Sequence, residues 1–163
     1  MFPARLDPKV LPPRAGETYL LAGDVVTFKA VGTETGGAYT LFEGRTAPGG
    51  GLPPHTHQFD EEAFFVMEGT YTFGIGEREV ELGPGGFVFG PRGVPHSFRN
   101  AGTTPGRLLT LVTPGGLFEQ FTAEIGQPLP GPEGATPAVP PDVARLVAVA
   151  VKDGIDFLPA PRG

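Results

Sequence analysis

Cysteine and tryptophan are absent from this sequence of 163 residues, and serine occurs only once, as Ser97. Without cysteine the chain can form no disulfide, no thiolate nucleophile and no sulfur-ligated zinc or iron site. The single serine directly follows His96, and neighbouring side chains on a strand point to opposite faces, so a serine–histidine catalytic pair is disfavoured. The chemistry of the protein is therefore expected from other residue types.

Basic runs and long apolar segments are missing as well. The net charge is −6, and no cluster of Lys and Arg could neutralise phosphates, so neither nucleic acid nor a membrane is expected as a partner. The longest uninterrupted apolar run covers residues 146–151, far short of the roughly 20 residues of a membrane-spanning helix. Because no apolar N-terminal segment precedes a small-residue cleavage site, we expect a cytoplasmic protein.

What the sequence does contain is three histidines that all fall inside two short patterns. The first pattern reads Gly49, five residues, His55-Thr56-His57, four residues, Glu62, six residues, Gly69. The second pattern reads Gly85, five residues, Pro91-Arg92-Gly93, two residues, His96, three residues, Asn100.

The spacing of His55 and His57 suits metal binding. Side chains two residues apart on a strand share one face, roughly 7 Å apart, so two imidazoles can converge on one cation. Metal–nitrogen bonds are about 2.0–2.2 Å long. The carboxylate of Glu62 would add an anionic oxygen, and His96 would add an imidazole from a neighbouring strand. Three histidines and one glutamate leave one or two coordination positions open, which is typical of catalytic sites.

Both patterns match, residue for residue, the two signature motifs of the cupin family, over residues 49–69 and 85–100. The resemblance implies an all-β fold, the double-stranded β-helix or jelly-roll barrel. It also implies a metal held by His55, His57, Glu62 and His96. Nitrogen and oxygen ligands suit Fe, Mn, Ni, Co, Cu and Zn alike, so the sequence predicts one divalent transition metal ion without selecting among these.

Three consecutive acids, Asp60, Glu61 and Glu62, leave the acidic ligand to be chosen. The cupin pattern tolerates three or four residues after the second histidine, but the six-residue gap to Gly69 selects Glu62. Adjacent strand residues face opposite ways, so Glu61 is expected in solvent or in a bulge.

Short β-branched and aromatic segments between Gly and Pro turns indicate an all-β sandwich or barrel. Strands are expected over 19–31, with a turn at Gly23-Asp24, and over 38–46, 63–68, 70–74, 78–82, 87–89, 96–100 and 107–113. We interpret residues 1–163 as one cupin domain: an arm over 1–17, a barrel core over 18–115 and a helical extension over 116–163.

The helical extension is read from two apolar stripes. The first comprises Leu117, Phe118, Phe121 and Ile125, before Gly126; the second comprises Val143, Leu146, Val147, Ala150 and Val151, before Gly154. One or two short C-terminal helices are therefore expected. The segment between them, 127–141, holds six prolines and is interpreted as irregular; whether it is a lid stays open.

Strand phase predicts the substrate pocket. If Glu62 points inward, Phe64 and Val66 share its face, and if His96 points inward, so does Phe98. Such walls suit a flat aromatic substrate better than a sugar phosphate, which needs inward Lys or Arg. Core packing alone is the more common explanation for Phe residues at such positions. Arg45 and Arg99 are the possible cationic exceptions, although Arg99 should face away.

Beyond the motifs, the chain resembles bacterial quercetin 2,3-dioxygenase-like cupins in its 115–121 segment, its Pro-rich stretch and its closing helix. This resemblance implies ring-opening dioxygenation of a flavonol, or a similar chelating hydroxy-ketone, by O2. Glu62 would act as both ligand and general base. A non-redox metallo-cupin, such as an isomerase or lyase, and a non-catalytic small-ligand-binding cupin remain alternatives.

Apolar residues at outward strand positions, Ala63, Phe65 and Met67, indicate a homodimer formed by sheet packing, together with the Pro-rich arm. A second layer of the same barrel could cover these residues equally well.

Overall fold

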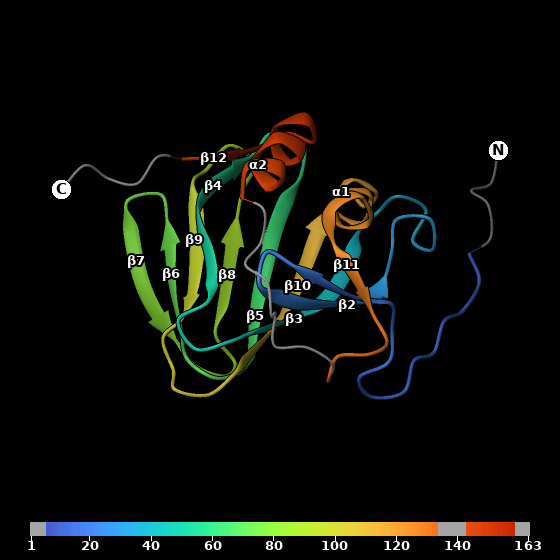
Figure 1. Cartoon of the computed structure of the whole chain (residues 1–163), viewed down its shortest axis with the longest axis horizontal. Helices are drawn as coiled ribbons and strands as arrows, with labels where there is room; N and C mark the ends of the chain where they lie inside the picture. Colours follow the sequence, from blue (N-terminus) through green and yellow to red (C-terminus); the bar gives the residue numbers. More distant parts are fainter. Residues whose placement is uncertain (1–5, 134–142, 159–163) are drawn as a thin grey trace.

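The computed structural model describes residues 6–133 and 143–158, and within these ranges the strands form two antiparallel sheets (Figure 1). The seven-stranded sheet has the spatial order β11 (Gln127–Leu129), β1 (Thr18–Leu21), β2 (Asp24–Ala30), β3 (Thr40–Thr46), β10 (Gly106–Thr113), β5 (Glu61–Glu68) and β8 (Phe87–Gly90). The five-stranded sheet has the order β12 (Ile155–Phe157), β4 (Gly51–His57), β9 (His96–Asn100), β6 (Tyr71–Ile75) and β7 (Arg78–Leu82).

Alternating burial along the strands explains why the two sheets face each other. Along β3 and along β10, every second residue is buried and the residues between them are partly exposed. A strand with this period has one face for a core and one for solvent. The two sheets bury these faces against each other, and the predicted double-stranded β-helix with two short C-terminal helices is confirmed.

The interior contains two clusters of buried apolar side chains. One cluster joins β1, β2, β3 and β10 to the two helices and β12: Leu21, Val26, Phe28, Phe42, Val112, Phe118, Phe121, Val149, Ala150 and Ile155. The other lies between β5, β8 and β10 and the strands β6 and β9 of the second sheet: Phe64, Val66, Tyr71, Phe73, Val88, Phe98 and Leu108. The functional site described below lies where these two clusters meet.

Two short strands were not predicted. β11 lies in the Pro-rich segment that was expected to be irregular, and it pairs with β1; the later part of that segment, residues 134–142, lies outside the described residues. β12 follows Gly154 and pairs with β4. Each contributes three residues, a length at which the partner strand decides the conformation and local sequence periodicity carries no signal.

The helices α1 (Leu117–Ile125) and α2 (Val143–Lys152) begin and end close to the expected bounds. In α2, however, the stripe that meets the protein is narrower than the sequence indicates. Val149 and Ala150 are buried, whereas Val143 and Val151 are 61% and 53% exposed. The physical reason is that, among the described elements, α2 packs mainly against α1 and β12, at one edge of the barrel, and so buries a single side of its apolar surface.

Several large apolar side chains lie exposed on the outer face of β5 and β8. Phe65, Phe87 and Phe89 are 44%, 62% and 47% exposed, and Phe65 and Phe87 are paired across the two strands. No other layer of the described chain covers these residues, and the homodimer through this face stays a prediction. Within the described residues, no helix is long and apolar enough to cross a membrane.

Candidate metal centre

An irregularity in β4 sets the position of the first two histidines. Between β4 and β9 the pairing runs from Leu52 opposite Phe98 to His55 opposite His96, so β4 carries one extra residue. The extra residue falls at Pro53-Pro54, where neither residue has an N–H group with which to continue the ladder. After this bulge, His55 and His57 are both buried and share the inner face of the strand, as their two-residue spacing requires.

Each of the three imidazoles is held by a hydrogen bond from its Nδ1. His55 donates to the carbonyl of Pro53 at 2.8 Å, and His96 donates to the carbonyl of Val94 at 3.0 Å. His57 donates to Oδ1 of Asp60 at 2.7 Å. Because each acceptor is an oxygen, the proton sits on Nδ1 and each Nε2 is left to face inward. This is the arrangement in which metal-ligating histidines are oriented by a second partner.

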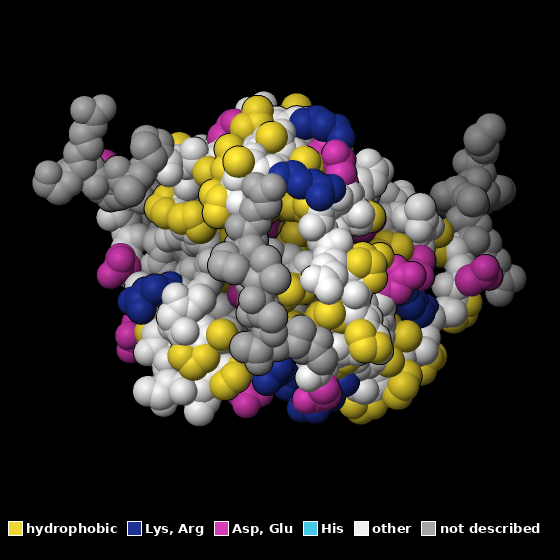
Figure 2. Space-filling view, in the orientation of Figure 1, with side chains coloured by type: hydrophobic (Ala, Val, Ile, Leu, Met, Phe, Trp, Pro, Cys, Tyr) yellow, Lys and Arg dark blue, Asp and Glu magenta, His cyan; other side chains and the backbone are white. Residues whose placement is uncertain are grey.

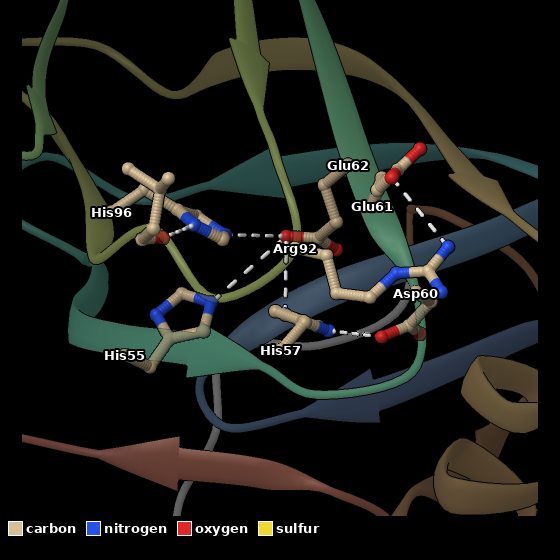
Figure 3. A network of polar contacts seen from close by, with 8 residues as sticks. His55, His57, Asp60, Glu61, Glu62, Arg92 and His96 are labelled. Atoms are coloured by element: carbon tan, nitrogen blue, oxygen red, sulfur yellow. Dashed lines mark hydrogen bonds and ion pairs between the residues drawn. The ribbon is translucent and has the colours of Figure 1, made fainter.

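The three Nε2 atoms converge on the carboxylate of Glu62 (Figure 3). Its Oε2 lies 3.1 Å from His96 Nε2, 3.4 Å from His57 Nε2 and 3.9 Å from His55 Nε2. One donor atom from each of the four residues lies within 4.8 Å of the others, and all four residues are buried. No histidine is visible on the molecular face in Figure 2, in keeping with this burial.

The three consecutive acids have three different environments. Glu62 is buried against the imidazoles, whereas Glu61 points the other way and lies 3.5 Å from the exposed guanidinium of Arg92. Asp60, to which the sequence analysis assigned no role, is 3% exposed and accepts a hydrogen bond from His57 Nδ1. The signal for Asp60 was available in principle: a carboxylate three residues after an expected ligand is within reach of its ring.

Opposite charges dominate the protonation of the cluster. Burial alone would lower the pKa of His57, but the carboxylates of Glu62 and Asp60 outweigh burial and raise the pKa to about 10. Burial alone would raise the pKa of Glu62, but charged His57 and the close contacts with the three imidazoles hold that pKa well below its usual range. A cation that binds here must displace the His57 proton, because a ligating imidazole is neutral, so affinity rises with pH.

The residues present fit a divalent transition metal. Three imidazole nitrogens and one carboxylate oxygen are the donor types that such ions take. The Nδ1 atom of each histidine already has a hydrogen-bond partner. The inward Nε2 atoms and the Glu62 carboxylate are therefore left to bind a common cation. The group of His55, His57, Glu62 and His96 could therefore bind one metal ion, whose identity these donors do not specify.

Two further residues, which the motifs do not single out as ligands or pocket, support the cluster. Gly90 pairs with Glu62 across β8 and β5, and a Cβ at position 90 would lie 3.0 Å from His96 Nδ1, so a larger residue would crowd the ring. The ring of Phe157 in β12 lies 5.6 Å from that of His55. The pairing of Gly90 with Glu62 and the contact of Phe157 with His55 join distant parts of the sequence, so neither has a local signal.

A cavity of about 60 Å³ opens beside His55, His57 and Glu62. Its walls come from both apolar clusters and include Phe42, Phe64, Phe98, Leu108, Phe118, Phe121 and Leu146. Two of the three residues expected in the substrate pocket, Phe64 and Phe98, line this cavity. The third, Val66, lies two residues further along the same face of β5, where it is 1% exposed and packs within the second cluster.

No arginine or lysine occurs among the described residues that line this cavity. Arg99 is exposed on the opposite face of β9, as expected from strand phase, and Arg45 lines a separate surface hollow with Glu43 and Arg107. The metal centre therefore faces a largely apolar space.

Comparison with known proteins agrees with this geometry. Residues 42–112 match the family model of the cupin domain, a span that contains all four candidate ligands. The chain belongs to the cupin superfamily. The alignment of this cupin with quercetin 2,3-dioxygenase of Bacillus subtilis (strain 168) has 27% identity over 124 residues and covers 76% of the chain and 36% of the relative.

Two polyketide proteins are also similar to this cupin. The tetracenomycin polyketide synthase protein TcmJ of Streptomyces glaucescens is 28% identical over 93 residues, which cover 57% of the chain and 62% of the relative. The structure of the polyketide cyclase RemF from Streptomyces resistomycificus superposes with a TM-score of 0.56 at 25% identity, over 65% of this chain and 79% of that one. The chain spans less than two thirds of the length of the two curated relatives, 36% of the quercetin 2,3-dioxygenase and 62% of TcmJ.

Replacing Asp60 by asparagine is expected to weaken metal binding roughly tenfold. The amide can still accept the His57 proton but carries no charge, and removal of a partner that orients a metal-bound histidine typically costs 10–100-fold in affinity. Competition with a chromogenic chelator would measure the change. Glu61→Gln makes the same kind of substitution one residue away, outside the cluster, and should bind like the wild type; equal affinities for both variants would contradict the assigned role of Asp60.

Proposed function

We propose that this cupin is a metal-dependent dioxygenase that cleaves a flavonol or a similar chelating aromatic hydroxy-ketone with O2. The observation that carries the proposal is the position of the four-residue donor group, three of whose members, His55, His57 and Glu62, line an apolar, aromatic-walled cavity without a cationic side chain among its described residues. Similarity to quercetin 2,3-dioxygenase supports the choice of substrate class.

His55, His57, Glu62 and His96 would hold the metal. When bound, the metal would supply a Lewis acid for the hydroxy-ketone of the substrate and, if it is redox-active, access to O2. The aromatic side chains Phe64 and Phe98 line the cavity and would contact a flat ring. The same apolar walls would exclude water from the reacting groups, which strengthens the electrostatic interactions within the site.

Glu62 would take the hydroxyl proton of the substrate. The carboxylate is ionised because its pKa lies well below the usual range, and its Oε2 is the atom on which the imidazoles converge. A weakly basic carboxylate can accept this proton only when the hydroxyl has itself become acidic, as a chelated enol does. One residue would then serve as ligand and as base.

The size of the cavity limits how such a substrate enters. A space of about 60 Å³ holds a few water molecules, so a flavonol needs some lining side chains to move. The partly exposed apolar side chains of the wall are Ala22, Leu52, Leu146 and Phe157, and the last two lie on α2 and β12, at the edge of the barrel. We therefore place the entrance beside α2 and β12.

Non-redox chemistry on an aromatic polyketide is the second candidate. The structural match to the polyketide cyclase RemF and the sequence match to TcmJ favour it, and the same apolar cavity would suit such a substrate. In this case the metal would orient and polarise oxygen atoms of the substrate, and O2 would not be consumed.

Oxygen uptake separates these functions. Protein loaded in parallel with Fe, Mn, Co, Ni, Cu and Zn would be given quercetin in an oxygen-electrode cell, with flavonol absorbance followed at the same time. We expect uptake and loss of the flavonol band with at least one redox-active metal, and neither change with Zn. Flavonol binding without uptake for any metal would contradict the dioxygenase and leave non-redox or binding functions.

A further inference from the structure

A second polar group lines the same cavity, away from the histidines. Asp24 opens β2, directly after the tight turn at Ala22-Gly23, and its carboxyl accepts a hydrogen bond from the Thr46 hydroxyl at 2.9 Å. Both residues line the cavity with His55, His57 and Glu62. We propose that Asp24 is a second anchor for the ligand: it binds a hydroxyl group at the end of the molecule remote from the metal-chelating end.

Strand register places Asp24 and Glu62 at opposite ends of the barrel. Glu62 lies opposite Val112 in β10, and Thr46 lies opposite Gly106 in the same strand. Six residues of strand separate these two levels, about 20 Å at 3.3 Å per residue. Side chains reach inward from both levels and shorten this gap. Phe64 and Leu108 line the cavity and lie between the two levels in the strand register, so a bound ligand would have an apolar middle and two polar ends.

One oxygen of Asp24 has a protein partner and the other does not. The Thr46 hydroxyl binds Oδ2, and the described residues give no hydrogen bond to Oδ1. Nearby, the hydroxyl of Tyr71 is fully buried and likewise lacks a hydrogen-bond partner among the described residues. Buried polar atoms are rarely left unpaired, and in this region Tyr71 has such an atom, while the partly buried Asp24 has an oxygen without a protein partner. Together they leave room for a partner supplied from outside the chain.

The charge around Asp24 selects the chemical class of that partner. Burial raises the pKa of Asp24 to about 7, with the Thr46 hydrogen bond opposing the shift. Burial likewise raises the pKa of Tyr71 to about 12, so its hydroxyl keeps its proton. The carboxyl group of Asp24 and the alcohol of Thr46, with no cationic residue lining the cavity in the described chain, would repel a carboxylate or a phosphate and bind a neutral hydroxyl.

This inference deepens the proposed function and rests on it, because it takes the cavity to be the substrate pocket. It predicts that substrates carry a phenolic or alcoholic hydroxyl opposite the chelating hydroxy-ketone. The alternative is a purely structural role, in which Asp24 only connects the β1–β2 turn to β3 through its hydrogen bond with Thr46.

The test compares two probes that share the chelating end. Quercetin carries hydroxyl groups on its outer rings, and 3-hydroxyflavone carries none. Binding to the metal-loaded protein would be titrated without O2 by the shift of the flavonol absorption band. We expect the wild type to prefer quercetin by roughly tenfold or more, the value of one buried hydrogen bond whose partner would otherwise be unpaired. Asp24→Leu should bind both probes about equally.

Two further variants make the outcome decisive. Asp24→Asn keeps hydrogen bonding without a charge and should retain the preference, and Arg45→Gln, on the outer face of β3 beside Thr46, should match the wild type. An undiminished preference in Asp24→Leu would overturn the anchor, whatever the enzyme does with O2. A preference lost in Asp24→Leu but no oxygen uptake would support the anchor and overturn the dioxygenase; binding of neither probe would overturn both.

Discussion

His57→Ala protein is expected to lose nearly all of its bound metal. The substitution removes one of three nitrogen donors and also the ring that couples Glu62 to Asp60. Partners that only orient a ligating histidine already contribute 10–100-fold to affinity, so loss of the histidine itself should cost more than about a hundredfold. Metal per chain, measured by mass spectrometry after dialysis against a weak chelator, should fall from about one to near zero.

Thr56→Ala is the matched control for this experiment, because Thr56 lies between the two histidines on β4 and faces the opposite side. It should keep its metal. Circular dichroism and thermal unfolding would establish that both variants are folded, and added metal should raise the unfolding temperature of the wild type and of Thr56→Ala alone. Full metal content in folded His57→Ala protein would contradict the assignment of His57 as a metal ligand.

Glu62→Gln should keep a large part of the metal and lose turnover. The amide has nearly the same shape and can still offer an oxygen, and the three histidines keep their Nδ1 partners. A glutamine, however, cannot accept the substrate proton. General base catalysis contributes about 10²–10⁴-fold, so flavonol-dependent oxygen uptake per bound metal should fall by that factor.

Glu61→Gln is the matched control, because it makes the same chemical change at a position outside the metal cluster. It removes a carboxylate from the adjacent residue, which is paired with Arg92 outside the cluster, and should leave turnover per metal unchanged. Wild-type turnover in metal-loaded Glu62→Gln would show that Glu62 is not the base. A parallel loss of metal and turnover would mean that Glu62 acts as a ligand alone.

The sequence predicted the strands of the barrel well where their residues alternate. β7 and β9 occupy the predicted residues, and β5, β6, β8 and β10 differ by one or two residues at their ends. Alternation is a local property, and in β5, β9 and β10 it survives in the fold because one face of the strand is buried. β7 alternates in sequence as well, but its residues remain largely exposed. For α2 the same logic failed in part: its valine-rich stripe is local, but which side of it becomes buried depends on what lies beside the helix.

The candidate ligands could also be predicted from the sequence, for a similar reason. Two histidines at strand spacing, followed by an acid and a third histidine in a second motif, are a one-dimensional pattern, and the structure brings all four into one buried group. The residues that contact these ligands could not be predicted from the sequence. Asp60 and Gly90 are close in sequence to a ligand but had no assigned role, and Phe157 and Asp24 come near the site only through pairings between distant strands.

By itself, the sequence determined the family, the all-β class and the set of residues able to bind a metal, because each depends on residue types at fixed short spacing. The tertiary structure alone decided how each imidazole ring is held, and that the cavity is apolar with a second carboxyl lining it. These features depend on strand register and on a one-residue bulge at Pro53-Pro54, which place side chains far apart in sequence on one inner surface.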